Sequence, residues 1–177
     1  MGQLHLILGP MFSGKTTELL GKLALLADIG QRCLFVNHSY DTRSEVVSSH
    51  RTSYCLPNNI TIVKRSNLDV DVEPFDVIGI DEGQFFSDIS TVVQWVGKGK
   101  IVYISSLDGD YQRHPFDKVL ALITEADSVT KKLAYCRSCL NKGVTSHAPF
   151  TKRVVDSCDR LLVGGSEFYQ PTCRQCM

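Results

Sequence analysis

One short stretch near the start of the chain, GPMFSGKTTELL at 9–20, restricts the possible fold more than any other. Its first eight residues match GxxxxGK[ST], a glycine-rich loop whose backbone N–H groups wrap around phosphates. This motif needs a buried strand before it and a helix after it, because the helix N-terminus attracts the phosphates. Both are predicted: LHLIL at 4–8 is short and apolar, and apolar residues recur at helical spacing from Leu19 to Ile29, just before Gly30.

The rest of the chain alternates short β-branched runs with helical or irregular segments, which is typical of a parallel sheet. We expect strands at 33–37, 61–64, 77–81 and 100–105, and a helix at 88–99 with Asp88 near its cap and Gly97 or Gly99 at its end. From residue 136 the composition changes to cysteine pairs and polar turns. We therefore predict an α/β fold, with a P-loop-type parallel sheet flanked by helices at 1–135 and a small second domain at 136–177.

Charge and hydropathy exclude several classes of protein. The 19 Lys and Arg residues balance 19 Asp and Glu residues, so the chain lacks the positive field that holds nucleic acid. No run of about 18 apolar residues occurs, and no basic region followed by a long apolar segment begins the chain. We expect a cytoplasmic enzyme with no membrane and no nucleic-acid partner.

The glycine-rich loop is expected to hold Mg-ATP. Its glycines let the backbone turn inward, Lys15 reaches the β- and γ-phosphates, and the Thr16 hydroxyl ligates Mg²⁺. The alternative is a glycine turn that binds nothing, and the predicted strand and helix on either side argue against it. We assign the whole loop to the nucleotide site: Gly9, Pro10, Met11, Phe12, Ser13, Gly14, Lys15 and Thr16.

Two adjacent acids follow the apolar run VIGI, at the edge of the sheet where open α/β folds bind ligands. Asp81 is interpreted as the second Mg²⁺ ligand, directly or through water. Glu82 points differently from its neighbour and can accept a proton from an attacking hydroxyl or orient a water. The alternative is a solvated strand end with no chemical role.

Two CxxC pairs lie 33 residues apart, at Cys136 and Cys139 and at Cys173 and Cys176. Four thiolates at this spacing indicate a closed, structural Zn²⁺ site, so that the segment between the pairs forms a lasso anchored at both ends. A redox pair and unrelated surface thiols are the alternatives. Cys33 is expected to be a buried strand residue.

Taken together, these residues resemble the type II thymidine kinases, the zinc-containing family of cellular cytosolic and poxvirus enzymes. The resemblance covers nearly the whole chain. It includes GPMFSGKTTEL, DTR at 41–43, IGIDEGQFF at 78–86, LDGDYQRHPF at 107–116, TKR at 151–153, VGG at 163–165 and both cysteine pairs. The segments at 78–86 and 107–116 are far more specific than the phosphate loop alone.

The resemblance implies transfer of the γ-phosphate of ATP to the 5′-hydroxyl of thymidine, with Mg²⁺ and a structural Zn²⁺. It implies that Glu82 is the catalytic base, and that Asp41, Arg43 and Gln84 belong to the nucleotide site with Asp81. It also implies feedback inhibition by thymidine triphosphate and a homotetramer. The implied substrate-binding residues are Met11, Phe85, Leu107, Tyr111, Phe116, Arg160, Leu161, Leu162, Val163, Gly164 and Tyr169.

Some of these residues depart from the family pattern. Tyr111 stands where many members have Phe, Arg160 where an apolar residue is common, and Asp110 where a small or hydroxylated residue is common. These changes concern base selectivity and not the type of reaction. For Phe85, Leu107 and Phe116, ordinary core packing is the alternative to a place in the nucleoside pocket.

Two other classes of function compete with the kinase. A P-loop ATPase or switch would transfer the phosphate to water, and it would hydrolyse ATP without any nucleoside. A zinc-ribbon nucleic-acid-binding module would need a basic and aromatic surface, which the zero net charge disfavours.

Overall fold

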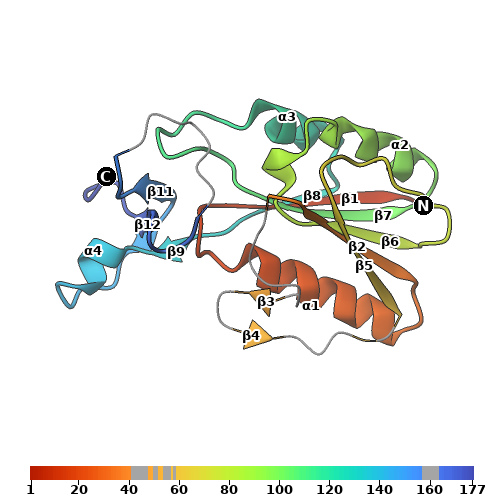
Figure 1. The fold of residues 1–177 in the computed structure, drawn as a ribbon, viewed down its shortest axis with the longest axis horizontal. Helices are drawn as coiled ribbons and strands as arrows, with labels where there is room; N and C mark the ends of the chain where they lie inside the picture. The colour runs from red at the N-terminus through yellow and green to blue at the C-terminus, as the bar shows by residue number, and fades with distance from the viewer. Residues whose placement is uncertain (41–47, 50–51, 54–56, 58, 157–163) are drawn as a thin grey trace.

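A six-stranded parallel sheet forms the centre of the protein (Figure 1). The computed structural model describes residues 1–40, 48–49, 52–53, 57, 59–156 and 164–177. The strand order is β5-β2-β6-β7-β1-β8, and each neighbouring pair runs parallel. The predicted parallel α/β sheet is confirmed. Its strands are β1 (Gln3–Leu8), β2 (Cys33–His38), β5 (Ile60–Arg65), β6 (Val77–Ile80), β7 (Ile101–Ser106) and β8 (Ser128–Lys131).

Helices cover both faces of the sheet (Figure 1). On one face α1 (Lys15–Asp28) packs Leu19, Leu20 and Leu23 against β2 and β6. The other face carries α2 (Val92–Gly97) and α3 (Asp117–Leu120), together with the 3-10 helices η2 (Ile89–Thr91) and η3 (Ala121–Glu125). In β1, β2, β6 and β7 the residues alternate between the two cores, so these four strands are apolar on both faces, as the continuous apolar runs predicted.

The α1 helix can approach the sheet closely because β6 contains a glycine. A Cβ atom at Gly79 would lie 2.6 Å from Cδ1 of Leu23 and 3.1 Å from Cδ1 of Leu19. Gly30, beyond the end of α1, has a φ of 91°, in agreement with the predicted left-handed glycine after the helix. The phosphate loop therefore begins a long helix that is firmly packed on the sheet.

The predicted helix at 88–99 is only partly correct. The segment forms η2 at 89–91 and then a short α-helix at 92–97, and the Asp88 side chain does not cap it. The Asp88 carboxylate instead accepts a hydrogen bond from the Leu68 amide at 2.8 Å. This long-range contact competes with local capping and is invisible to a pattern along the chain.

The C-terminal lobe, residues 134–156 and 164–177, lies beyond the carboxyl ends of the sheet strands (Figure 1). It contains two short hairpins, β9 (Ala134–Tyr135) with β10 (His147–Ala148), and β11 (Phe150–Arg153) with β12 (Tyr169–Thr172), and the helix α4 (Arg137–Leu140). A separate pair of two-residue strands, β3 (Ser48–Ser49) and β4 (Thr52–Ser53), is antiparallel. Among the described residues, no helix combines the length and apolar character that crossing a bilayer requires.

Candidate active site

The phosphate loop connects β1 to α1 and turns sharply on itself. Gly9 has a φ of 152° and Gly14 a φ of 77°, and Phe12 adopts a left-handed conformation with a φ of 64°. The Lys15 ammonium donates to the carbonyl of Pro10 at 2.8 Å, and the Ser13 hydroxyl donates to the same carbonyl at 2.8 Å. Lys15 therefore folds back over the loop, where an ammonium group can meet phosphate oxygens at the start of α1.

The buried carboxylate of Asp81 lies directly after β6 and faces the phosphate loop. Only 3% of Asp81 is exposed. Burial and the neighbouring Glu82 carboxylate raise the pKa of Asp81 to about 6, and a hydrogen bond from Thr16 and the charge of Lys15 oppose this shift. The structure thus brings Thr16, Lys15 and Asp81 together, as the sequence predicts. A hydroxyl and a carboxylate oxygen are suitable ligands for Mg²⁺.

Glu82 is held in an unusual conformation at the start of the 3-10 helix η1 (Gly83–Phe85), with a φ of 55°. Non-glycine residues with this backbone conformation are uncommon and are found disproportionately at functional sites. Asp81 is buried, whereas Glu82 is half-buried and accepts a hydrogen bond from Gln84, so the two adjacent acids have different surroundings. This geometry agrees with the different roles expected for them.

The Gln84 amide connects Glu82 to the end of β7. Its Oε1 accepts hydrogen bonds from the Leu107 amide at 3.0 Å and from the Ser106 hydroxyl at 2.9 Å, while its Nε2 donates to Oε2 of Glu82 at 2.5 Å. The backbone N–H of Leu107 can only donate, so the orientation of the Gln84 amide is determined by its partners. The observed contacts of Gln84 therefore orient the Glu82 carboxylate.

A further cation lies next to the phosphate loop. Lys131 is the last residue of β8 and forms an ion pair with Asp108, the second residue of the 107–116 segment. Burial and the charge of Lys15 lower the pKa of Lys131, which indicates that the two ammonium groups are close enough to interact. Sequence reasoning missed Lys131, because the exposed strand SVTK carries too weak an apolar pattern to be placed in the sheet.

The loop that carries Tyr111 is stabilised from within by Asp110. The Asp110 carboxylate accepts hydrogen bonds from the backbone amides of Gln112 and His114, both at 2.9 Å. Its other oxygen lies 3.5 Å from Nδ1 of His114. Only 6% of Asp110 is exposed, so the departure from the family pattern at this position has a structural role in shaping the loop.

Three of the expected nucleoside-binding residues lie where separate segments meet. Met11 belongs to the phosphate loop, Tyr111 to the 107–116 loop and Tyr169 to the C-terminal lobe. The Met11 amide donates to Oγ1 of Thr151 on β11 at 2.9 Å. Tyr111 and Tyr169 both contact the guanidinium of Arg153, two residues further along β11. Thr151 and Arg153 belong to the TKR motif at 151–153, but the sequence alone predicts no site role for either residue. Their alternate spacing on a strand, which places both on one face, was the signal for their shared role.

The other expected pocket residues have mixed surroundings. Phe85 lies beside the rings of His38 and Tyr40, with centroid distances of 5.5 and 5.8 Å. Phe116 packs against the main hydrophobic core, which agrees with the alternative of ordinary packing. Gly164 lies against the Phe168 ring, which leaves no room for a side chain there. Outside the described residues lie Asp41, Arg43, Arg160, Leu161, Leu162 and Val163.

A cavity of about 230 Å³ opens between the phosphate loop, the 107–116 loop and β11. Acidic and basic side chains share its wall with Phe150, whose ring lies 5.7 Å from the Arg113 guanidinium and 4.9 Å from that of Arg174. The lining residues are Pro10, Asp108, Gly109, Asp110, Arg113, Pro115, Leu120, Pro149, Phe150 and Thr151.

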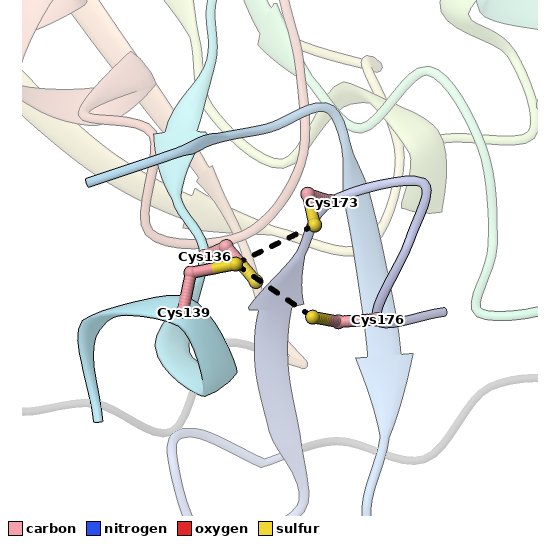
Figure 2. Close-up of side chains that lie close together, drawn as sticks. All are labelled: Cys136, Cys139, Cys173 and Cys176. Carbon is pink, nitrogen blue, oxygen red and sulfur yellow. Dashed lines mark hydrogen bonds between the residues drawn. The ribbon is translucent and has the colours of Figure 1, made fainter. Parts of the chain in front are cut away.

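The four predicted cysteine ligands form one cluster. Figure 2 shows Cys136 and Cys139, from the start of α4, facing Cys173 and Cys176, which follow β12. All four sulfur atoms lie within 4.8 Å of one another, and Sγ of Cys139 is 3.8 Å from that of Cys173 and 3.7 Å from that of Cys176. A tetrahedron with Zn–S bonds of about 2.3 Å has sulfur separations of about 3.8 Å, whereas a disulfide requires about 2 Å. The cluster therefore fits a structural zinc ion.

Cys33 is separate from this cluster. It lies fully buried in β2, and burial raises the pKa of its thiol to about 11. The expectation that Cys33 is a buried strand residue is confirmed. A buried thiol with a raised pKa is neither an available metal ligand nor a reactive nucleophile.

Comparison with known proteins agrees with the geometry. A family model described as thymidine kinase matches residues 2–177. Thymidine kinase 1 of Dictyostelium discoideum is 39% identical over 187 residues, which cover 99% of this chain and 77% of that protein. The thymidine kinases of Rabbit fibroma virus (strain Kasza) and Vaccinia virus (strain Western Reserve) are 36% and 37% identical, and the alignments cover 99% of this chain and 96% of each viral protein.

Proposed function

The chain belongs to the thymidine kinase family, and from this premise we propose that it transfers the γ-phosphate of ATP to the 5′-hydroxyl of thymidine. The products are thymidine monophosphate and ADP. The observation that carries the proposal is the position of Glu82, an oriented carboxylate beside the Thr16, Lys15 and Asp81 group. A proton acceptor at this place is needed when the phosphoryl acceptor is a hydroxyl.

The phosphate loop would bind the triphosphate through its inward-facing N–H groups and Lys15. When bound, Mg²⁺ would neutralise charge on the β- and γ-phosphates, and Thr16 and Asp81 would hold it. We assign Asp41 and Arg43 to the same triphosphate, on the resemblance alone. Positioning and charge stabilisation supply most of the rate enhancement in such transfers, because little covalent chemistry falls to the protein.

Glu82 would accept the proton of the thymidine 5′-hydroxyl while the 5′-oxygen forms its bond to the γ-phosphorus. The bond between the γ-phosphorus and the bridging oxygen of ADP breaks, and the electron pair leaves with ADP. Tyr111 and Tyr169 would enclose the thymine ring, with Met11 and Leu107 nearby, because a flat methylated base favours aromatic faces and an apolar niche.

Three finer proposals rest on the family resemblance. Thymidine triphosphate would inhibit the enzyme by occupying both substrate sites. The protein would form a homotetramer, and it would act in the cytoplasm. The division of the chain into domains at 1–135 and 136–177 likewise stays a prediction.

An acceptor screen tests the function. Purified protein with Mg-ATP is incubated with thymidine, deoxyuridine, deoxycytidine or no nucleoside, and nucleotide products are separated from free phosphate. We expect thymidine monophosphate to form fastest. Since one methyl group in an apolar niche contributes only about 1–3 kcal/mol, deoxyuridine is expected to react more slowly but measurably. Hydrolysis of ATP that thymidine does not alter would instead support the P-loop ATPase.

Replacing Gln84 with methionine is expected to lower kcat by about 10- to 100-fold, because a poorly oriented base loses rate steeply with small displacements. The KM values for ATP and thymidine should remain within about threefold of the wild type, on the general expectation that the lost contact acts on catalysis and not on ground-state binding. Steady-state kinetics with each substrate varied in turn provide the measurement.

Gln94→Met in α2 is the matched control, since Gln94 is exposed and lies on the outer helix layer. A Gln84→Met enzyme with normal kcat and a raised KM for ATP would contradict the orienting role. That outcome would favour the direct nucleotide contact that the resemblance implies.

A further inference from the structure

We infer that Arg153 is a positioning residue of the nucleoside site, which holds Tyr111 and Tyr169 in the relative arrangement that encloses a base. The inference deepens the proposed function and rests on it, because these two rings meet thymine only under that assignment. Arg153 lies at the end of β11 and reaches both rings from the C-terminal lobe.

The contacts of the Arg153 side chain are close and directional. Its Nη2 donates to the Tyr169 hydroxyl at 2.9 Å, and its Cζ lies 3.8 Å from the centroid of the Tyr111 ring and 5.4 Å from that of Tyr169. A planar guanidinium can stack on one aromatic ring while its edge donates to another group. The Arg153 guanidinium thus stacks on the Tyr111 ring and donates to the Tyr169 hydroxyl at the same time.

Arg153 is also unusually buried for a charged residue, with only 9% of its surface exposed. Removing a guanidinium from water is costly, so a chain keeps it inside only where its contacts offset that cost. Exposed arginines can be replaced with little effect, but the contacts of a buried one control the position of its neighbours.

The two tyrosines have different supports, and Arg153 connects them. Tyr169 stands directly opposite Arg153 in the β11–β12 hairpin, which continues into Cys173. Tyr111 belongs to the loop that Asp110 stabilises beside the sheet. Their separation therefore depends on a contact that crosses from the C-terminal lobe to the sheet. Arg153 supplies that contact.

The same face of β11 also meets the phosphate loop, through the 2.9 Å hydrogen bond from the Met11 amide to Thr151. The contacts of Thr151 and Arg153 position the C-terminal lobe at two different places. Thr151 places the lobe against the phosphate loop, and Arg153 places it against Tyr111. Loss of Arg153 should therefore weaken nucleoside binding and leave ATP binding largely intact.

Arg153→Met, which keeps much of the length and removes the guanidinium, tests the inference. We expect the KM for thymidine to rise about tenfold or more, since the variant loses both the hydrogen bond from a charged donor to Tyr169 and the stacking on Tyr111. The KM for ATP should change less than about twofold, and Arg153→Lys should not restore thymidine binding because the ammonium lacks the planar fork. Arg137→Met, at an exposed arginine of the same lobe, is the matched control.

Tyr169→Phe provides a milder variant that keeps the ring and removes only the hydroxyl. It should raise the KM for thymidine by severalfold. Both variants lose the same hydrogen bond between Arg153 and the Tyr169 hydroxyl. The KM for thymidine of the double variant should therefore lie within about twofold of that of Arg153→Met alone. Thermal unfolding of every variant is measured in parallel.

Each outcome bears on the inference. An active wild type with an unchanged KM for thymidine in Arg153→Met overturns it while the proposed function stands. Equal rises in both KM values together with a lower unfolding temperature reveal general destabilisation, and they also overturn it. A wild-type protein that does not phosphorylate thymidine contradicts the proposed function itself and removes the basis of the inference.

Discussion

Replacing Glu82 with glutamine is expected to slow phosphoryl transfer by about two to four orders of magnitude and to leave nucleotide binding intact. The amide has nearly the same shape as the carboxylate, and its oxygen can still accept the hydrogen bond from Gln84. It cannot take the proton of the attacking hydroxyl. Since a positioned general base typically contributes 10²- to 10⁴-fold, kcat should fall by about that factor.

The measurement combines thymidine monophosphate formation under saturating substrates with calorimetric binding of ATP. The dissociation constant for ATP should stay within about threefold, because the residues assigned to the triphosphate are untouched. Glu125→Gln, at an exposed glutamate at the end of η3, is the control for the loss of one negative charge. A Glu82→Gln enzyme that keeps more than about a tenth of the wild-type kcat would show that Glu82 is not the base.

Removal of zinc is expected to abolish thymidine binding before the sheet unfolds. The four cysteines connect α4 to the end of β12, and the neighbouring strand β11 carries Thr151 and Arg153. A structural zinc ion contributes on the order of 10–16 kcal/mol in small domains, so a lobe with so little core should lose its order without it. Within the described part of the chain, the hydrophobic cluster around the cysteines shares no residue with the two sheet cores.

When a chelator removes the metal, three measurements should therefore respond differently. Thymidine binding should disappear, ATP binding should persist, and the circular dichroism of the sheet and helices should change little. Adding Zn²⁺ back should restore thymidine binding. Cys136→Ser should reproduce the loss, while Cys33→Ala should retain the metal, because Cys33 lies in β2 away from the cluster. Unchanged thymidine binding in a sample shown to be free of zinc would refute this account.

The centre of the fold could be predicted because its signals are local. Residues 4–8, the glycine-rich loop and the leucines of α1 form a strand, loop and helix that physical rules recognise without tertiary information. The positions of the two acids, buried Asp81 and half-buried Glu82, follow from their place after an apolar strand. The zinc cluster was predictable for a similar reason, since cysteine spacing within each pair is set by the geometry of the metal.

Other parts of the molecule depend on contacts between distant residues. The segment predicted as one helix at 88–99 forms a 3-10 turn at 89–91 and an α-helix at 92–97, and the Asp88 side chain binds the Leu68 amide and does not cap it. Strand β8 completes the sheet with side chains that are all exposed, and its pattern alone does not identify a strand. The contact of Arg153 with Tyr111 joins residues 42 positions apart (153 − 111). No local periodicity encodes such a contact.

The fate of the γ-phosphoryl group tests the central claim most directly. The protein is given γ-labelled Mg-ATP with thymidine, with 5′-deoxythymidine, which lacks the acceptor hydroxyl, or with no nucleoside. The account predicts that the label appears on the 5′-oxygen of thymidine, and that this transfer exceeds release of free phosphate by about 100-fold or more, as expected when a bound hydroxyl excludes water. Label released as phosphate at one rate in all three reactions would contradict it.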